Sequence, residues 1–380
     1  MIFHILGPDD PALEALSEYI KTHPGANLHL TIVPWDNYQN TLNDALNQSQ
    51  SPFQAVFIPG HVWLSTLVEE KKVAPLPVQR VSSELLSQFN LDDVFPKVRS
   101  ECFYEEEWFL IPFFTDGHIL FYLKDKIHLE VETEEEIPFI SPKNLEQLVA
   151  SVHHPPSLYG LALKASPSEI FLDWLPFLWD FGGDVLDNES KPIIYSDASV
   201  SALEVYCNLR QFCPPETHRF GNNEIAAVLR ASLVCIAPTW GGQAAPIYAE
   251  GAAMRYSTAL YSTPWNATWG IGIPANQPAS LITQTTEHLL SIAWQAIDQK
   301  VLELAGSPVR NSTYTETNFK RYAWLKTQMK MLQRCSTLPS TPKLGKILGV
   351  LYPAIYSAFI GEVSPRKALS GAQLALEQII

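Results

Sequence analysis

The chain has 380 residues, of which 46% are hydrophobic and 17% are charged. This length and composition predict two folded domains and exclude a largely disordered chain. The formal net charge of −14 disfavours nucleic acid and anionic membranes as partners, because an acidic surface repels phosphate groups.

The first hundred residues alternate predicted strands and helices. The strands are expected at 2–6, 28–33 and 55–58, and the helices at 11–21, 38–47 and from 62 onward. This order predicts a parallel sheet with helices on both faces. Ligands bind such sheets beyond the carboxyl ends of the strands, so the loops after these strands are expected to line one edge.

Two further strands are expected at 108–112 and 117–122, and the turn-poor segment 113–116 between them suits a crossing between two lobes. Later helices are expected at about 142–152, 168–181, 225–231 and 281–304, and later strands at 159–163 and 233–237. The segment 261–274, rich in Ser, Thr, Pro, Trp and Gly, is expected to be a second crossing.

The sequence contains no apolar run of the roughly 20 residues that a membrane-spanning helix needs. It also begins without a basic segment or a small-residue cleavage site, so no export signal is visible. These observations fit a cytoplasmic protein or an exported protein whose signal has been removed.

Motifs of the common enzyme classes are missing from the sequence. It has no zinc-ligand spacing, P-loop, dinucleotide fingerprint or Gly-x-Ser-x-Gly motif. We therefore expect no metal, no cofactor and no enzymatic activity. A glycosidase is an alternative, because sequence alone does not show whether two carboxylates are spaced for glycoside hydrolysis.

Six segments carry a family resemblance when they are taken in chain order. They are Ala55–Pro59 with Leu64–Leu76, Trp108–Lys124, Phe177–Leu186, Val234–Trp240, Gly306–Ser312 and Ile360–Leu369. Two of them contain short phrases, Gly-Gly-x-x-Leu at 182–186 and Gly-x-Pro-x-Arg-x-Ser at 306–312. Together they resemble family 1 of the extracellular solute-binding proteins of ABC importers, a group that includes the maltodextrin-binding proteins.

The resemblance implies an α/β fold of the two-lobe, periplasmic-binding-protein-like type II, in which each lobe is a mostly parallel sheet flanked by helices. The N-terminal lobe is expected at 1–113 with 264–312, and the C-terminal lobe at 114–263 with 313–380. The resemblance also implies that a sugar or related polyhydroxy solute binds in the interlobe cleft and is trapped by hinge closure.

The same resemblance implies an extracytoplasmic monomer that delivers its solute to the permease of an ABC importer. It implies no cofactor and no role in nucleic-acid binding. The alternative within this fold is the ligand-sensing protein of a signalling system, which uses the same clamp without a transporter.

Sugar rings stack on aromatic side chains, and their hydroxyls need carboxylates, amides or Arg as partners. Trp240 is the first candidate, because it follows a predicted strand in a Gly-rich loop and matches the family's pocket Trp. Gly241 and Gly242 would let the backbone approach a ligand, or would simply begin a helix. Asp116, at the expected hinge, would accept hydrogen bonds from hydroxyls, or would be a turn residue.

The remaining candidates follow predicted strands, flank a crossing or match a family loop. They are Asp9, Trp35, Asp36, His61, Trp63, Trp179, Trp265 and Arg310. Each has a structural alternative: a Trp covers a sheet end or fills a core, Asp9 complements a helix N-terminus, and Arg310 braces its lobe.

Overall fold

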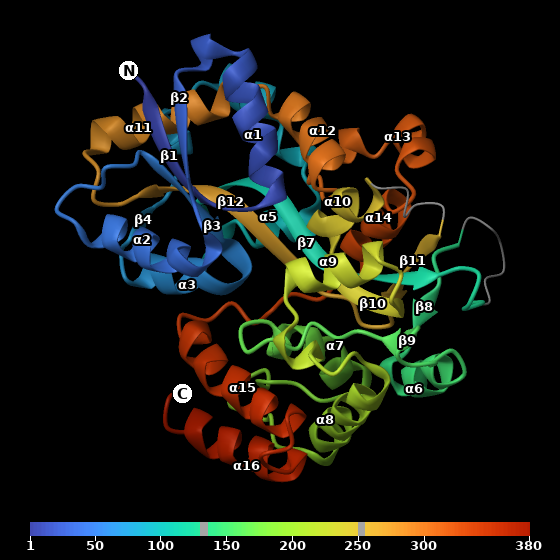
Figure 1. Ribbon diagram of the computed structural model, residues 1–380. Coiled ribbons are helices and arrows are strands. Elements are labelled where there is room, and N and C mark those ends of the chain that lie inside the picture. The colour runs from blue at the N-terminus through green and yellow to red at the C-terminus, as the bar shows by residue number, and fades with distance from the viewer. Residues whose placement is uncertain (130–135, 250–254) are drawn as a thin grey trace. The chain divides into compact units, whose positions relative to one another are not determined.

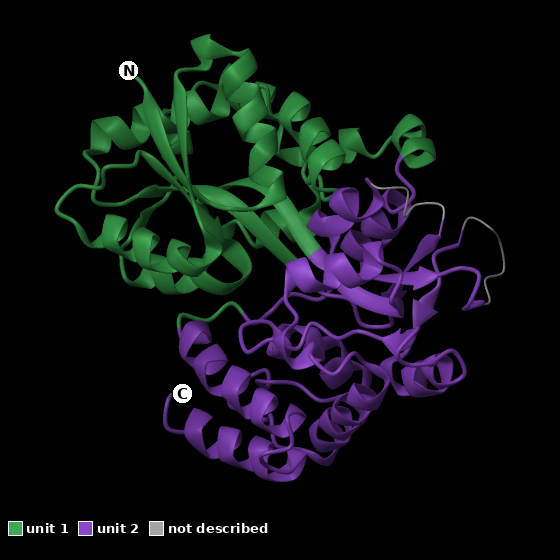
Figure 2. Cartoon of the chain, viewed as in Figure 1, with its two compact units in different colours: residues 1–116, 266–321, 340–342 green, residues 117–265, 322–339, 343–380 purple. Residues whose placement is uncertain are grey.

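The computed structural model describes residues 1–129, 136–249 and 255–380 (Figure 1). The chain divides into two compact units (Figure 2). Unit 1 comprises Met1–Asp116, Asn266–Arg321 and Ser340–Pro342, and unit 2 comprises Gly117–Trp265, Tyr322–Pro339 and Lys343–Ile380. Each unit is therefore assembled from three separate segments of the chain.

The unit boundaries lie close to the predicted lobe boundaries, apart from two short segments, 313–321 and 340–342. The first two changes of unit fall at 116/117 and 265/266, against 113/114 and 263/264 in the prediction. Residues 313–321, predicted in the other lobe, belong to unit 1 because Asn318 donates a 2.8 Å hydrogen bond to Gln299 of that unit. Residues 340–342 belong there because the Thr341 carbonyl accepts a 2.8 Å hydrogen bond from Ser65.

The sheet of unit 1 begins with three parallel strands. β1 (Phe3–Pro8) lies between β2 (Leu28–Val33) and β3 (Ala55–Pro59) and runs parallel to both. β12 (Asn266–Pro274) pairs antiparallel with β3 and with the short β4 (Val73–Ala74). All five residues of β3 are buried, as expected for a central strand that has helices on both sides.

Helices cover this sheet, and their starts follow the strand ends. α1 (Pro11–Thr22) begins with proline in its first turn, and the Asp10 side chain caps it by accepting a 2.8 Å hydrogen bond from the Ala12 amide. α1 packs beside α12 (Trp294–Leu304) (Figure 1). The other elements of unit 1 are α2 (Trp35–Asn47), α3 (Gly60–Glu69), α4 (Ser83–Phe89), α5 (Pro96–Ser100), the hairpin of β5 (Phe103–Tyr104) and β6 (Glu107–Trp108), α11 (Ala279–Leu290) and α13 (Glu316–Arg321).

A single long strand, β7 (Leu110–Leu123), begins in unit 1 and ends in unit 2. All 14 of its residues are buried. The prediction of two strands joined through residues 113–116 was therefore wrong. These four residues carry apolar or β-favouring side chains and no turn former except Asp116, so they stay extended within one strand.

The sheet of unit 2 is mixed. β10 (Val234–Trp240) pairs parallel with β9 (Tyr159–Leu161) and antiparallel with β7. β11 (Tyr256–Tyr261) pairs antiparallel with β7 and parallel with β8 (Phe139–Ile140).

The core of unit 2 is built around α7 (Ile170–Asp180), in which every residue from Ile170 to Leu178 is buried. A helix that is buried on all sides must be covered on all sides, and α8 (Asp197–Leu209) and α15 (Leu344–Phe359) pack against it. The other helices of unit 2 are α6 (Pro142–Ala150), α9 (Asn222–Arg230), α10 (Ala244–Tyr248), α14 (Leu325–Arg334) and α16 (Pro365–Leu376).

The predicted helix over 281–304 is two helices, α11 and α12. The break falls at Ser291, whose amide donates to the Glu287 and His288 carbonyls and whose hydroxyl donates to the His288 carbonyl. These bonds satisfy the end of α11 locally, so a new helix can start at Trp294. Within the described residues, no helix is both long enough and apolar enough to cross a bilayer.

Candidate functional site

Unit 1 gathers five of the predicted site residues at one edge of its sheet. The parallel strands β1, β2 and β3 end at this edge, and they are followed by Asp9, by Trp35 with Asp36, and by His61 with Trp63. The Asp9 amide donates a 2.9 Å hydrogen bond to the carbonyl at the end of β2, which ties two of these loops together. We call this edge the unit 1 face.

Aromatic side chains dominate the unit 1 face, and Trp269 of β12 lies at their centre. The ring centroids of Trp35 and Trp63 lie 5.6 and 6.5 Å from that of Trp269, both in edge-on arrangements. Phe114 stacks on Trp269 at 5.7 Å with nearly parallel planes. Trp269 is only 7% exposed, whereas Trp35 is 48% exposed. The buried rings therefore support one indole, that of Trp35, which is available to a ligand.

Trp269 lies in the segment 261–274, where the sequence predicted a crossing and gave Trp265 and Trp269 together as possible ligand contacts. Its central role follows from the antiparallel pairing of β12 with β3, which puts Trp269 opposite Pro59 at the strand end. Pairing between segments so far apart in the chain leaves no local pattern in the sequence.

His61 contributes a neutral imidazole to this face. Burial lowers its pKa to about 4, although the hydrogen bond to the Thr268 carbonyl opposes this change. The His61 Nδ1 lies 3.2 Å from that carbonyl oxygen, which only accepts, so Nδ1 carries the proton. The Nε2 atom then has a lone pair at neutral pH and can accept a hydrogen bond from a hydroxyl.

A buried polar network lies where β12 and β7 enter unit 1. Glu101 accepts a 2.7 Å hydrogen bond from Asn266, which in turn accepts one from the Thr115 hydroxyl. Burial raises the pKa of Glu101 to about 8, against the lowering effect of its hydrogen bonds from Thr268 and Asn266. Glu101 is therefore protonated at neutral pH. Asp116, the predicted hinge carboxylate, is buried next to Thr115 at the last position of unit 1.

Unit 2 has its own cluster at the end of β10, which we call the unit 2 face. The Lys164 ammonium lies 3.2 Å from the centroid of the Trp240 ring. His118 and Trp265 also contact this indole, with centroid distances of 4.6 and 5.1 Å. Trp240 is 8% exposed. The ring predicted as the main stacking surface thus has one face covered by a cation of the protein itself.

Lys164 is fully buried, and its charge is compensated locally. Its Nζ lies 3.2 Å from Glu169 Oε2 and 3.1 Å from Asn222 Oδ1. Asp173 lies in the same cluster and accepts a 2.8 Å hydrogen bond from Tyr206 and a 3.0 Å hydrogen bond from the Lys164 amide. Burial raises the pKa of Asp173 to about 6, while the Lys164 charge lowers it. The unit 2 face therefore carries no excess positive charge at neutral pH.

Several buried polar atoms at the unit 2 face have no hydrogen-bond partner among the described residues. They include both ring nitrogens of His118, Oδ1 of Asp173 and both amide atoms of Gln328. The His118 Nε2 lies 3.9 Å from Asp173 Oδ1, too far for a hydrogen bond. Burial and then the Lys164 charge lower the pKa of His118 well below its ordinary value, so the ring is neutral. Such atoms cost about 1–3 kcal/mol each unless a ligand or solvent satisfies them.

Gly241, the first glycine after Trp240, packs closely against a helix of unit 2. A Cβ atom at Gly241 would lie 2.3 Å from Oε1 of Gln328 on α14. Gly242 is buried in the same short turn before α10. The close approach at Gly241 is thus to a neighbouring helix, and a ligand contact at these two glycines stays a prediction.

Two of the predicted residues lie apart from both faces. Arg310 is buried in unit 1, where it donates hydrogen bonds of 3.0 and 3.2 Å to the Phe89 and Asn90 carbonyls and forms a 3.6 Å ion pair with Asp93. The bracing role, weighed from the sequence as the alternative, is the one its contacts favour. Trp179 is half-buried near the end of α7, and its indole donates to Asp184 at 3.2 Å.

Two α/β units, each with aromatic and polar side chains at its strand ends, define the class of two-lobe solute-binding proteins. Comparison with solved structures agrees with this fold, as the sequence predicted. An ABC transporter solute-binding protein of Agrobacterium radiobacter K84, in complex with ribitol, has a TM-score of 0.85 and 18% identity, covering 100% of this chain and 99% of its own. The maltose-bound MalE3 of T. maritima has a TM-score of 0.84 and 15% identity, with the same coverage.

A third structure, a solute-binding protein of Thermotoga lettingae TMO bound with α-D-tagatose, has a TM-score of 0.83 and 18% identity, again covering 100% and 99% of the two chains. No curated protein sequence matches the chain. The family model of the bacterial extracellular solute-binding proteins matches residues 8–279. The chain therefore belongs to this family, as its sequence motifs indicated.

Proposed function

We propose that this protein is the solute-binding component of an ABC importer and that its solute is a neutral sugar or polyol. The observation that carries the proposal is the indole of Trp35, 48% exposed and held edge-on against buried Trp269. A rigid, exposed aromatic plane is the surface on which the C–H groups of a sugar or polyol stack. The similar structures with ribitol, maltose and tagatose support the same class of solute.

The charges on both faces favour a neutral solute over an anionic one. The buried cation of unit 2, Lys164, already has Glu169 at 3.2 Å as its counter-ion. The unit 1 face carries the exposed carboxylates of Asp9 and Asp36. An anionic solute would be repelled by these carboxylates, and the charge of Lys164 is already paired with Glu169.

Hydrogen-bonding capacity also suits a polyhydroxy compound. The buried amide of Gln328, whose two polar atoms have no hydrogen-bond partner among the described residues, can both donate and accept. Hydroxyl groups donate and accept as well, so one compound rich in hydroxyls can satisfy atoms of both kinds. We include Trp240, Trp265, Asp116 and Trp63 among the proposed contacts.

We further propose that the protein works outside the cytoplasm as a monomer, with an importer permease as its partner, and that it leaves its solute unchanged. The family consists of extracellular binding proteins. Trapping of the solute by hinge closure is part of the same proposal.

The test is isothermal titration calorimetry with ribitol, mannitol, tagatose and maltose, with recovery of the solute afterwards. We expect saturable binding of at least one of them, recovered chemically intact, and a loss of affinity in Trp35→Ala. The matched control is Tyr195→Ala, which truncates an aromatic side chain of similar exposure (42%) in unit 2. Absence of binding to every neutral sugar and polyol, with binding to an anionic or apolar solute instead, would overturn the proposal.

A further inference from the structure

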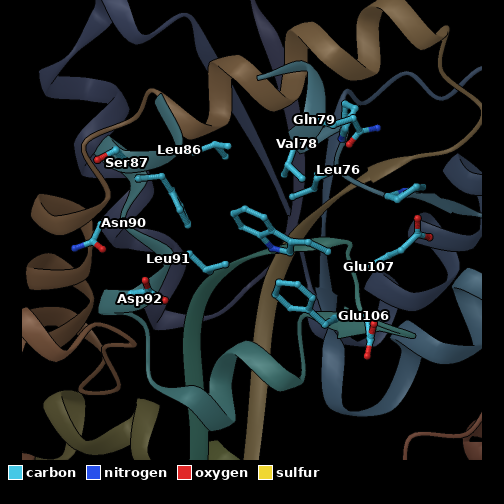
Figure 3. Close-up of a pocket in the computed structure, with 15 residues that line it drawn as sticks. Leu76, Val78, Gln79, Leu86, Ser87, Asn90, Leu91, Asp92, Glu106 and Glu107 are labelled. Atoms are coloured by element: carbon cyan, nitrogen blue, oxygen red, sulfur yellow. The ribbon is translucent and has the colours of Figure 1, made fainter. Parts of the chain in front are cut away.

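Unit 1 has a pocket that shares no residue with the unit 1 face. Its volume is about 700 Å³, and it lies between α4, the loop after β4 and the hairpin of β5 and β6 (Figure 3). Ligand pockets typically have volumes of about 300–1,000 Å³. The pocket is therefore large enough for a small molecule and too small for a folded partner.

The inner part of this pocket is apolar and aromatic. Leu76, Phe89 and Trp108 are buried there, and Val78 and Phe103 are half-buried. The Trp108 and Phe103 rings stack with nearly parallel planes at a centroid distance of 5.9 Å, and Phe89 contacts Trp108 at 5.4 Å.

The indole N–H of Trp108 donates to the Leu110 carbonyl, which fixes the ring in place. The apolar surface is thus formed before any ligand arrives, so binding has little ordering cost to overcome.

The polar residues of the pocket are acidic or neutral. Glu106 and Glu107 stand at one side, and Asn90 and Asp92 stand at another (Figure 3). No Lys or Arg is among the described residues that line it. Asp92 has a partner outside the pocket, Arg99, at 2.7 Å, so the uncompensated negative charge is that of the two glutamates.

We propose that this pocket binds an organic cation that carries an apolar ring. The ring would replace water against the apolar inner part, where burial of apolar surface favours binding. The charged group would lie at the rim, close to Glu106 and Glu107 and to the half-buried ring of Phe103. An anion of the same shape would meet two carboxylates and no lining cation.

The hairpin tip provides a matched pair of glutamates for the test. Glu105 and Glu106 form the turn between β5 and β6, and both have positive φ, 46° and 68°. Both are exposed, yet only Glu106 lines the pocket. Conversion of either to Gln removes the same charge from the same type of backbone position, so a difference between them reports the pocket alone.

The experiment is calorimetric titration of the full chain with benzyltrimethylammonium chloride, and with sodium phenylacetate as the anionic probe that carries the same ring. We expect saturable binding of the cation and none of phenylacetate. The double variant Glu106→Gln with Glu107→Gln should weaken cation binding about threefold to tenfold, as the loss of two surface charge contacts implies. Glu105→Gln should change it less than twofold.

A second variant tests the apolar part. Val78 lies half-buried in the wall of the pocket, so Val78→Ser should weaken binding of the cation without unfolding the chain. A thermal melt verifies that the variant is folded. The proposal is overturned if phenylacetate binds as well as the cation, if Glu105→Gln and Glu106→Gln have equal effects, or if the cation does not bind saturably. No sugar is needed in this experiment, so its result does not depend on the proposed transport function.

Discussion

Replacement of the buried Lys164 by Met should destabilise unit 2 strongly. The change removes the cation that lies 3.2 Å from both Glu169 and the centroid of the Trp240 ring. Removing one partner of a buried ion pair costs about 3–5 kcal/mol, because the other charge stays buried without compensation. Glu169 keeps some contact with solvent, with 14% of its side chain exposed, so we expect the lower value, about 3 kcal/mol.

The assay is urea unfolding followed by Trp fluorescence, together with a thermal melt. A loss of about 3 kcal/mol corresponds to a fall in Tm of about 6–12 °C for a unit of this size. The double variant Lys164→Met with Glu169→Gln should recover part of the loss, since the carboxylate of Glu169 is then no longer left without its cation.

Lys143→Met is the matched control, because Lys143 also lies over an aromatic ring, 4.8 Å from the centroid of Phe181, but is exposed. This control should change stability by no more than about 0.5 kcal/mol. A loss below about 1 kcal/mol in Lys164→Met would refute the conclusion that its charge is held by a buried pair.

Trp35→Ala should weaken binding of the neutral solute by about 1–3 kcal/mol, if ring stacking is its contribution, with little loss of stability; calorimetry and a thermal melt separate the two effects. Arg310→Met should lower the unfolding free energy by about 3–5 kcal/mol, since it removes the cation beside Asp93 and the donor to two carbonyls, and should leave solute affinity unchanged in calorimetry at low temperature. Unchanged stability together with lost affinity would instead make Arg310 a ligand contact. Glu101 has a folded-state pKa of about 8, above its unfolded value, so its contribution to stability is present below pH 4.5 and is lost as pH rises through 8. Unfolding free energies measured from pH 5 to 8.5 should fall with pH in the native chain and less steeply in Glu101→Gln; parallel curves would contradict the raised pKa.

The residues of the unit 1 face could be predicted from the sequence, because their positions follow from the order of strands and helices along the chain. Strands that alternate with helices run parallel, so the residues after them meet at one edge. Trp35 follows β2 and His61 follows β3, and both strands pair with β1 and end at that edge. The resemblance to a known family then supplied the fold of the second half of the chain, where the local patterns are weaker.

The interior of the unit 2 face could not be predicted in the same way. Lys164, Asp173 and His118 come from a loop, a helix and a strand, and His118 is distant in sequence from the other two. Each looks like an ordinary surface or core residue in its own segment, and only tertiary packing brings their charges together. The cover that Lys164 forms over Trp240 follows from that packing.

The segmented construction of unit 1 has a consequence for how the protein is made. β3 ends at Pro59, but its neighbour β12 is complete only at Pro274. At about 5–20 residues per second, a ribosome needs on the order of 10–40 s to cover that interval. During this time, the nascent chain carries an apolar central strand with one side unpaired, which is a template for aggregation. A chaperone that shields Ala55–Pro59 until late in translation would therefore raise the yield of folded protein.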